Sequence, residues 1–431
     1  MKILHVNKFY YPHGGTETYM MALMEEQQRQ GHEIAIFAME DPRNLPTPWN
    51  VYFSEPVKTN FQFPISNFQL WSSAFRFVYN RQARQKFEEI LDAFQPDVVH
   101  LHNYYHHLSV AILKPLIKRK IPAVQTLHDY HIVDPTYKFY CNGKVFEQTK
   151  GGKYWKIIAP KCIHRSRWAS ILETIEFTLI KKLGWDTAAV QSVICPTVFL
   201  QKKIIEYGVP PEKTVVVAHP AFSAKGPGSS DQPPPGRDPA VAGVSEPRVT
   251  TTIDVLYVGR ISEEKGVDLL LQAMSHIDNP SVRLHIVGDG PERARLERLA
   301  TNLHLTTVEF HGRLVPVDVA AWYDRAAFVV LPTQWYEVSP MVIGEAAAHG
   351  KCVVASTIGG LPELIDNGST GMLVEPANIA LWAQRIQWLA EHPADAARMG
   401  QNAQARYASN TMEKHLEEIE RVYEMAIKFK S

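Results

Sequence analysis

Two carboxylates, Glu337 and Glu345, stand eight residues apart in one short segment of the chain. Pro340 lies between them and suits the first turn of a helix, so we expect Glu345 inside that helix and Glu337 on the loop before it. The amino end of a helix offers unpaired N–H groups and a positive dipole end to a phosphate. Glu345 could accept hydrogen bonds from ribose hydroxyls and Glu337 from a sugar. A surface helix with two incidental acids is the alternative that the spacing alone leaves open.

Two cations, Arg260 and Lys265, follow an apolar run in the turn from Gly259 to Gly266. A guanidinium fork and an ammonium aimed at one point suit a diphosphate, and a solvated charged turn is the alternative. Similar turns follow later apolar runs and contain Gly288, Arg313 with Leu314, and Gly359-Gly360. Because parallel strands end at one edge of a sheet, these loops are expected to converge there.

The first half of the chain carries fewer chemical signals. Gly14 and Gly15 follow its first apolar run, and only glycine allows a backbone N–H to approach a ligand so closely. His128 stands in the sequence Thr126-Leu127-His128-Asp129 at the end of another apolar run. A lone histidine is more often structural, but a His-Asp pair at a strand end favours a functional role.

Short apolar runs alternate with helical patterns in both halves of the 431-residue chain, which is typical of parallel sheets covered by helices. Strands are predicted at residues 2–6, 33–38, 98–101, 123–127, 192–195 and 214–217, and again at 255–258, 283–287, 308–310, 328–331 and 352–355. Helices are predicted at residues 17–30, 266–276, 292–303 and 412–428. We therefore expect an α/β protein with two Rossmann-like, doubly wound domains facing across a cleft. The predicted parts are 1–222, a Pro-, Gly- and Ser-rich linker or loop at 223–251, 252–411, and a final helix at 412–431.

The composition is that of an ordinary globular protein, and 45 basic residues balance 45 acidic ones, which argues against bulk nucleic-acid binding. Residues 138–182 hold ten basic and three acidic residues. This excess of positive charge predicts a basic patch that binds a membrane surface or an anionic acceptor, and a solvated basic face is the alternative. No apolar run approaches the roughly 20 residues of a membrane helix, and no secretory signal is visible. We expect a cytoplasmic protein, with peripheral membrane contact left open. The four cysteines, Cys141, Cys162, Cys195 and Cys352, are expected as reduced thiols.

Taken together, the motifs resemble the retaining glycosyltransferases of family 4, which have the GT-B fold. The resemblance rests on Gly259-Arg260 with Lys265-Gly266, Gly288-Asp289-Gly290-Pro291-Glu292, Glu337 with Glu345, Gly359-Gly360 with Pro362-Glu363, and Asn367 with Gly371. Pro12-His13-Gly14-Gly15 and His128-Asp129 agree with it, and residues 137–168 are similar to bacterial surface-polysaccharide members. Two departures are the 223–250 insert and the sequence Val338-Ser339-Pro340, where Gly-Phe-Gly is commoner.

The resemblance implies that the second domain holds a nucleotide diphosphate sugar and the first an acceptor. Arg260 and Lys265 would neutralise the diphosphate, Glu345 would hold the ribose, and Glu337 would contact the donor sugar. His128 would contact that sugar near the reacting carbon. Further donor contacts would come from Gly14, Gly15, Gly259, Gly288, Arg313, Leu314, Ser339, Pro340 and Met341. The last helix would cross back to the first domain.

A bound metal is not expected, because the chain contains no Asp-x-Asp sequence that would hold a divalent ion on the diphosphate. Cations and helix dipoles would stabilise the leaving group instead, so no cofactor is predicted. A group of histidines, His100, His102, His106, His107, His128 and His131, is expected to line the cleft or acceptor wall rather than to bind a metal.

The predicted activity is transfer of a hexosyl unit, with retention, from a UDP- or GDP-sugar to a lipid-linked or polysaccharide acceptor. The same chemistry on a soluble sugar phosphate is one alternative. A non-catalytic nucleotide-sugar binder and a GT-B epimerase are the others.

Overall fold

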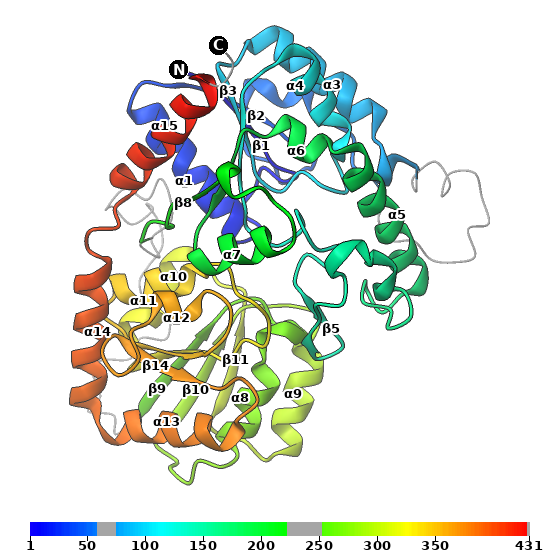
Figure 1. Ribbon diagram of the computed structural model, residues 1–431. Coiled ribbons are helices and arrows are strands. Elements are labelled where there is room, and N and C mark those ends of the chain that lie inside the picture. Colours follow the sequence, from blue (N-terminus) through cyan, green and yellow to red (C-terminus); the bar gives the residue numbers. More distant parts are fainter. Residues whose placement is uncertain (58–74, 222–251, 429–431) are drawn as a thin grey trace. The chain divides into compact units, whose positions relative to one another are not determined.

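The computed structural model describes residues 1–57, 75–221 and 252–428, so the predicted linker at 223–251 lies outside the described residues. The chain divides into two compact units, each built on a six-stranded sheet (Figure 1). The first unit comprises Met1–Pro220, Trp335–Ser339 and Asn410–Ser431. The second comprises Ala221–Gln334 and Pro340–Ser409.

The sheet of the first unit is parallel throughout. Its strands lie in the order β2 (Glu33–Phe37), β1 (Lys2–Val6), β3 (Val98–Leu101), β4 (Ala123–Thr126), β7 (Ser192–Cys195) and β8 (Thr214–Val216). All six predicted strands are present, with boundaries within one residue. They are continuous apolar runs because helices bury both faces of a parallel sheet. Strand order reverses beside β1, and ligands in such sheets bind at the carboxyl ends near that point.

The helices of the first unit are α1 (Gly15–Arg29), α3 (Arg81–Phe94), α4 (Leu113–Arg119), α5 (Arg167–Leu183), α6 (Trp185–Ala189), α7 (Val198–Glu206) and α15 (Met412–Lys428). The final helix α15 packs on this unit. Ile419, Val422 and Tyr423 join Ile3 and Val98 in a buried apolar cluster. The apolar stripe of α15 is thereby covered by the first sheet.

The sheet of the second unit is also parallel. Its order is β11 (Val308–Gly312), β10 (Val282–Val287), β9 (Ile253–Val258), β12 (Phe328–Leu331), β13 (Val353–Ser356) and β14 (Gly371–Val374). The five predicted strands are confirmed to within two residues, and β14 was not predicted. Strand order reverses between β9 and β12, so the loops after these two strands meet at the switch point of the sheet. Two doubly wound parallel sheets confirm the predicted fold class.

The helices of the second unit are α8 (Val267–Met274), α9 (Arg293–Asn302), α10 (Pro316–Arg325), α11 (Met341–Ala348), α12 (Leu361–Leu364), α13 (Ile379–Glu391) and α14 (Pro393–Tyr407). Pro340 is the N-cap of α11 rather than a residue of its first turn. Glu345 lies inside α11 and Glu337 lies before it, as the sequence predicts.

The cysteine prediction is wrong for one pair. Cys141 and Cys162 form a disulfide, with their Cα atoms 5.0 Å apart, whereas Cys195 and Cys352 are free and buried. Cys141 belongs to a small hairpin of β5 (Tyr140–Cys141) and β6 (Lys144–Val145). The cysteines pack with Phe146, Ile157 and Ile163 in a separate apolar cluster. A spacing of 21 residues carries no sequence signal, and only this packing brings the two sulfurs together.

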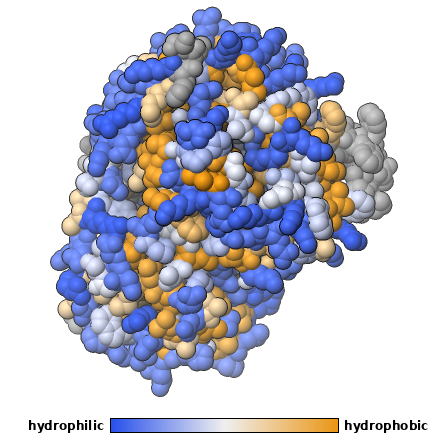
Figure 2. Space-filling model, viewed as in Figure 1, coloured by the Kyte–Doolittle hydropathy of each residue, from blue (hydrophilic) through white to orange (hydrophobic). Residues whose placement is uncertain are grey.

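Helix α5 exposes an apolar stripe. Trp168, Ile175, Leu179 and Leu183 are each 42–46% exposed and follow one another at helical spacing. Figure 2 shows hydrophobic side chains along the side of the molecule where α5 lies in Figure 1. Among the described residues no helix is both long and apolar enough to span a bilayer.

Candidate functional site

The loops at the carboxyl edge of the second sheet are joined by backbone hydrogen bonds. Gly259 N–H donates to Val287 O at 3.0 Å, and Ile261 N–H donates to Asp289 O at 3.0 Å. Gly288 N–H donates to Gly312 O at 2.8 Å. The turns that follow β9, β10 and β11 therefore form one continuous surface, as their parallel order predicts.

Two glycines allow this close packing. A Cβ atom on Gly266 would lie 1.9 Å from Pro332 O, and one on Gly288 would lie 1.9 Å from Gly259 O. Both residues also have positive φ angles, +68° and +142°. Side chains are excluded at these positions because backbone from the neighbouring loop occupies the space.

Arg260 and Lys265 both lie on the loop between β9 and α8, at the switch point of the sheet. Arg260 is exposed, and its carbonyl accepts a hydrogen bond from Tyr257 Oη at 2.9 Å. Lys265 is partly buried and ends a short 3-10 turn, Glu263–Lys265, immediately before Gly266. Glu264 O accepts hydrogen bonds from Thr333 Oγ1 and Gln334 N. The loop that carries both cations is thus fixed to the end of β12.

Helix α11 carries the second glutamate of the sequence motif. The hydroxyl of Tyr323, on α10, donates to Glu345 Oε2 at 2.7 Å. Burial raises the pKa of Glu345, although this hydrogen bond favours the charged form. Tyr323 fixes one carboxylate oxygen, so Glu345 can use the other to accept a hydrogen bond from a hydroxyl. Met341 begins the helix, whose first N–H groups have no partner within it.

Glu337 and Ser339 are counted with the first unit, whereas Pro340, Met341 and Glu345 belong to the second. Glu337 is 3% exposed, and its neighbour Tyr336 packs against Phe199, with ring centroids 5.1 Å apart. The Glu337–Glu345 motif is therefore divided between the two units.

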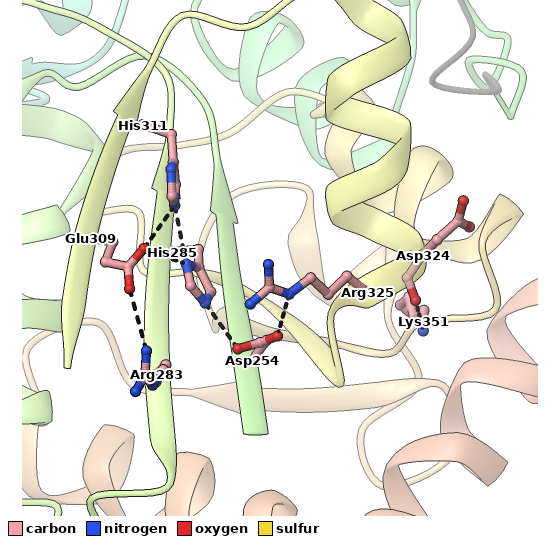
Figure 3. Close-up of polar contacts among 8 residues, drawn as sticks. All are labelled: Asp254, Arg283, His285, Glu309, His311, Asp324, Arg325 and Lys351. Carbon is pink, nitrogen blue, oxygen red and sulfur yellow. Dashed lines mark hydrogen bonds and ion pairs between the residues drawn. The ribbon is translucent and has the colours of Figure 1, made fainter. Parts of the chain in front are cut away.

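Arg313 and Leu314 follow β11 directly; Arg313 is exposed and Leu314 partly buried. A polar network anchors this strand to its neighbours (Figure 3). Asp254 accepts from His285 Nε2 at 2.9 Å and from Arg325 Nε at 2.6 Å, while His285 Nδ1 lies 3.0 Å from His311 Nε2. Burial alone would raise the pKa of Asp254, but these hydrogen bonds outweigh it and hold that pKa below its ordinary value. The network fixes the base of the loop that presents Arg313.

Gly14 and Gly15 lie at the amino end of α1, after β1 of the first sheet. Gly14 is the N-cap in extended conformation, and both glycines are exposed. Glu17 Oε1, in the first turn, accepts from Asn7 Nδ2 at 3.0 Å. Burial raises the pKa of Glu17, with the hydrogen bond from Asn7 opposing the shift. The glycines therefore present exposed backbone at a helix start, which suits an anion.

His128 is the end of a chain of imidazoles that we call the histidine network: His5, His100, His102 and His128. His5 Nδ1 lies 3.1 Å from His102 Nε2, and His102 Nδ1 lies 3.1 Å from His128 Nε2. His5 Nε2 lies 2.7 Å from Gln27 Oε1. His100 and His102 are fully buried, so the prediction that these two residues line a cleft or acceptor wall is wrong.

Burial keeps the histidine network neutral. It lowers the pKa of His5 to about 4 and that of His128 to about 3, and it lowers those of His100 and His102 well below the ordinary value. A neutral imidazole has one N–H donor and one acceptor. Because Gln27 Oε1 can only accept, His5 donates from Nε2, and the same polarity passes through His102 to His128. His128 therefore carries its proton on Nε2 and keeps a lone pair on Nδ1.

Several residues that hydrogen-bond to the histidine network or to α15 belong to no sequence motif and are not predicted from the sequence. The hydroxyl of Tyr423, on α15, lies 2.7 Å from His100 Nδ1. The same hydroxyl accepts a hydrogen bond from Gln27 Nε2 at 3.0 Å. Tyr19 Oη lies 2.8 Å from His415 Nε2. The two residues of each pair are 323 or 396 positions apart in sequence. No local pattern could have found these contacts.

Two doubly wound parallel sheets in one chain are the arrangement of the GT-B class of α/β proteins. A family model described as "Glycosyl transferases group 1" matches residues 244–406, and one described as "Glycosyltransferase Family 4" matches residues 13–221. The chain belongs to the family 4 glycosyltransferases, and the predicted resemblance is confirmed.

Known relatives agree with this assignment. D-rhamnosyltransferase WbpZ of Pseudomonas aeruginosa is 38% identical over 154 residues, which are 35% of this chain and 40% of WbpZ. The chain thus spans about two fifths of the length of that relative. The structure of sucrose-phosphate synthase from Thermosynechococcus elongatus matches with a TM-score of 0.68 at 20% identity, and the match covers 99% of each chain. Anabaena HepE, solved with UDP and glucose, has a TM-score of 0.66 at 19% identity, over 99% of this chain and 100% of HepE.

Proposed function

We propose that the protein transfers a hexosyl unit from a UDP- or GDP-sugar to an acceptor hydroxyl, with retention of configuration at the anomeric carbon. The proposed acceptor is a lipid-linked sugar or a growing polysaccharide. Family membership supports the reaction class, and a similar fold in a protein solved with UDP and glucose is consistent with a nucleotide-sugar donor.

The observation that carries the proposal is the arrangement at the switch point of the second sheet. An exposed guanidinium and an ammonium share the loop after β9, and that loop is hydrogen-bonded to the end of β12. The chain then leads from β12 to the amino end of α11. Two cations and a helix start suit the diphosphate of a nucleotide-sugar.

In this proposal Arg260 and Lys265 neutralise the charge that develops on the diphosphate as the bond to the sugar breaks. Glu345, already held by Tyr323, accepts hydrogen bonds from the ribose. Loop and backbone contacts come from Gly259, Gly288, Arg313, Leu314, Ser339, Pro340 and Met341. The transfer needs no metal at the diphosphate.

In this proposal, residues counted with the first unit contact the donor sugar and add backbone at the diphosphate. Glu337 contacts the donor sugar, and Gly14 and Gly15 present backbone to the diphosphate. His128 contacts a sugar hydroxyl near the reacting carbon. Since His128 is neutral with a lone pair on Nδ1, it would act there as a hydrogen-bond acceptor and not as a cation.

A lipid-linked acceptor would require the protein to work at a membrane surface. The apolar stripe on α5, with Lys181 and Lys182 in its last turn, combines apolar and basic groups in the way of helices that lie on anionic bilayers. We therefore propose peripheral membrane contact through this face.

Incubating the chain with a panel of nucleotide-sugars and acceptors, followed by mass spectrometry and NMR of the product anomer, tests the function. We expect a hexosylated lipid-linked or polysaccharide product with the donor configuration. Product formed only on a soluble sugar phosphate would support the alternative acceptor class. Donor binding without transfer would indicate a non-catalytic binder, and an isomerised donor would indicate an epimerase.

Vesicle co-sedimentation tests the membrane contact. The double variant Ile175→Ser/Leu179→Ser should lose binding to vesicles that contain anionic phospholipid. Val51→Ser is the matched control, because Val51 is an exposed apolar residue of the same unit outside the stripe. Equal sedimentation of both variants would contradict the proposed face.

A further inference from the structure

Within the described residues, three groups of histidines and acids are close enough to hold a metal ion. In the first, His5, His100 and His102, the nitrogens are already hydrogen-bonded to Gln27, Thr126, Tyr423 and one another. In the second, His285 is bonded to Asp254 and Glu309 is paired with Arg283 (Figure 3). The buried histidines of these two groups are thus already hydrogen-bonded to neighbouring side chains.

The third group, His106, His131, Glu173 and Glu176, is different. We call it the His-Glu cluster. Its four ligand atoms lie within 4.8 Å of one another. Glu173 is 1% exposed and Glu176 is 0% exposed, yet within the part of the chain that the structure describes none of their four carboxylate oxygens has a hydrogen-bond partner. His131 Nε2 is also buried without a hydrogen-bond partner.

The side chains of the His-Glu cluster converge from three elements. Glu173 and Glu176 are three residues apart on one face of α5. His131 comes from the loop after β4 and His106 from the loop after β3. Glu173 Oε1 lies 3.5 Å from His131 Nε2, and Glu173 Oε2 lies 3.8 Å from His106 Nδ1. The edge of a tetrahedron with metal–ligand bonds of about 2.1 Å is about 3.4 Å.

Two buried carboxylates without donors are a costly arrangement unless an opposite charge accompanies them. Burial raises the pKa values of Glu173 and Glu176 well above the ordinary value; the charge of Asp134 adds to the shift of Glu173, and that of Lys8 opposes it. The Lys8 ammonium lies over the Tyr105 ring, 4.7 Å from the centroid. One ammonium cannot balance two carboxylates or occupy the lone pairs of two imidazoles. A divalent cation would do both.

We propose that His106, His131, Glu173 and Glu176 bind one divalent transition-metal ion, with Zn²⁺ the best match. Two imidazole nitrogens and two carboxylate oxygens are typical ligands of Zn²⁺, whereas Mg²⁺ and Ca²⁺ prefer oxygen alone. This role for His106 and His131 replaces the acceptor wall that the sequence predicts for them. No local pattern in the sequence indicates that Glu173 and Glu176 meet these histidines, because the ligands lie on three separate elements.

The ion would fix the loops of the first unit. It would join the loops after β3 and β4 to α5, and His131 is only three residues beyond His128. The Tyr105 ring stacks on His131 at 3.8 Å and holds that ligand in place. The site contains none of the residues assigned to sugar transfer, so the inference stands independently of the proposed function.

Metal analysis of the full chain, made without an affinity tag and purified without chelator, tests the site. We expect close to one equivalent of transition metal per chain by mass spectrometry of the digested protein. Protein denatured with chelator and refolded should bind ZnSO₄ in calorimetry with 1:1 stoichiometry. Absence of metal, together with no saturable zinc binding by the refolded protein, would overturn the proposal.

The double variant Glu173→Gln/Glu176→Gln locates the ion. It preserves shape but removes the charges, so it should lose the metal and unfold at a lower temperature than the wild type. Glu17→Gln is the matched control, since Glu17 is a buried carboxylate of the same unit with its own partner, Asn7, and it should keep the metal. Without an ion, the double variant should instead leave the unfolding temperature unchanged or raise it, because burial already favours the neutral forms of both acids.

A milder variant covers the case in which the double variant does not fold. His106 is 17% exposed, and His106→Gln should fold while weakening zinc binding at least about tenfold. Full metal content with unchanged affinity in both ligand variants would place the ion elsewhere and refute the site.

Discussion

Replacing Gly266 by alanine should disrupt the loop that carries Lys265. The residue has φ +68°, where alanine is strained by roughly 1–2 kcal/mol. The new Cβ would also lie 1.9 Å from Pro332 O, and real Cβ contacts are essentially never under 3.0 Å, so the two loops must separate by about 1 Å. Overpacking of this kind costs roughly 1–3 kcal/mol. The expected loss of unfolding free energy is about 2–5 kcal/mol.

Gly368→Ala is the matched control, because Gly368 has φ +80° in the same unit but no atom within 4 Å of its Cβ position. It should cost only the backbone strain, roughly 1–2 kcal/mol. Urea unfolding followed by circular dichroism measures both variants. Turnover should also separate them, since a shift of about 1 Å in Lys265 costs on the order of 100-fold in rate. Equal stability and equal turnover of the two variants would refute the close-packing argument.

Three further predictions concern charge, metal and pH. Lys265→Ala and Arg260→Ala should each lower turnover on the order of 100- to 1,000-fold, and Arg260→Lys should not restore it; initial rates near wild type would contradict the assignment. Excess EDTA should leave initial rates unchanged, because a buried ion exchanges slowly and no ion is expected on the diphosphate; immediate loss reversed by Mn²⁺ or Mg²⁺ would place one there. The folded pKa values of His5, His128 and His415 are about 4, 3 and 4, below the unfolded value of 6.5, so the unfolded state binds their protons first. Their contribution to stability should be full above pH 7 and fall as pH drops from 6.5 towards 4, by about 1 kcal/mol each between pH 7 and 5.5. Denaturant titrations at the two pH values measure it, and equal stability would show that these histidines are not buried neutral.

The two sheets could be predicted because parallel strands are buried on both faces. Runs such as residues 98–101 and 328–331 therefore stand out as apolar segments between helical patterns. The glycines of the carboxyl-edge loops were recognisable for a related reason. Gly266 and Gly288 are required by their positive φ angles and by backbone of the loops that follow neighbouring strands of the sheet.

Part of the candidate site was also present in local sequence. The order of Arg260, Lys265 and Glu345 specifies a family, and each of these residues lies on the predicted loop or helix. The partner of Glu345 did not follow from that order. Tyr323 reaches it from a different helix, and nothing near either residue in the chain indicates the contact.

The sequence alone thus determined which segments are strands, which loops end them and which charged groups those loops carry, because each depends on a few neighbouring residues. Tertiary structure decided which distant side chains share an environment. The disulfide of Cys141 with Cys162, the neutral chain from Gln27 to His128, and the meeting of Glu173 with His106 and His131 all depend on it. In each case the chemistry of a group, whether oxidised, uncharged or able to bind an ion, is set by burial among residues that only the packing of separate elements brings together.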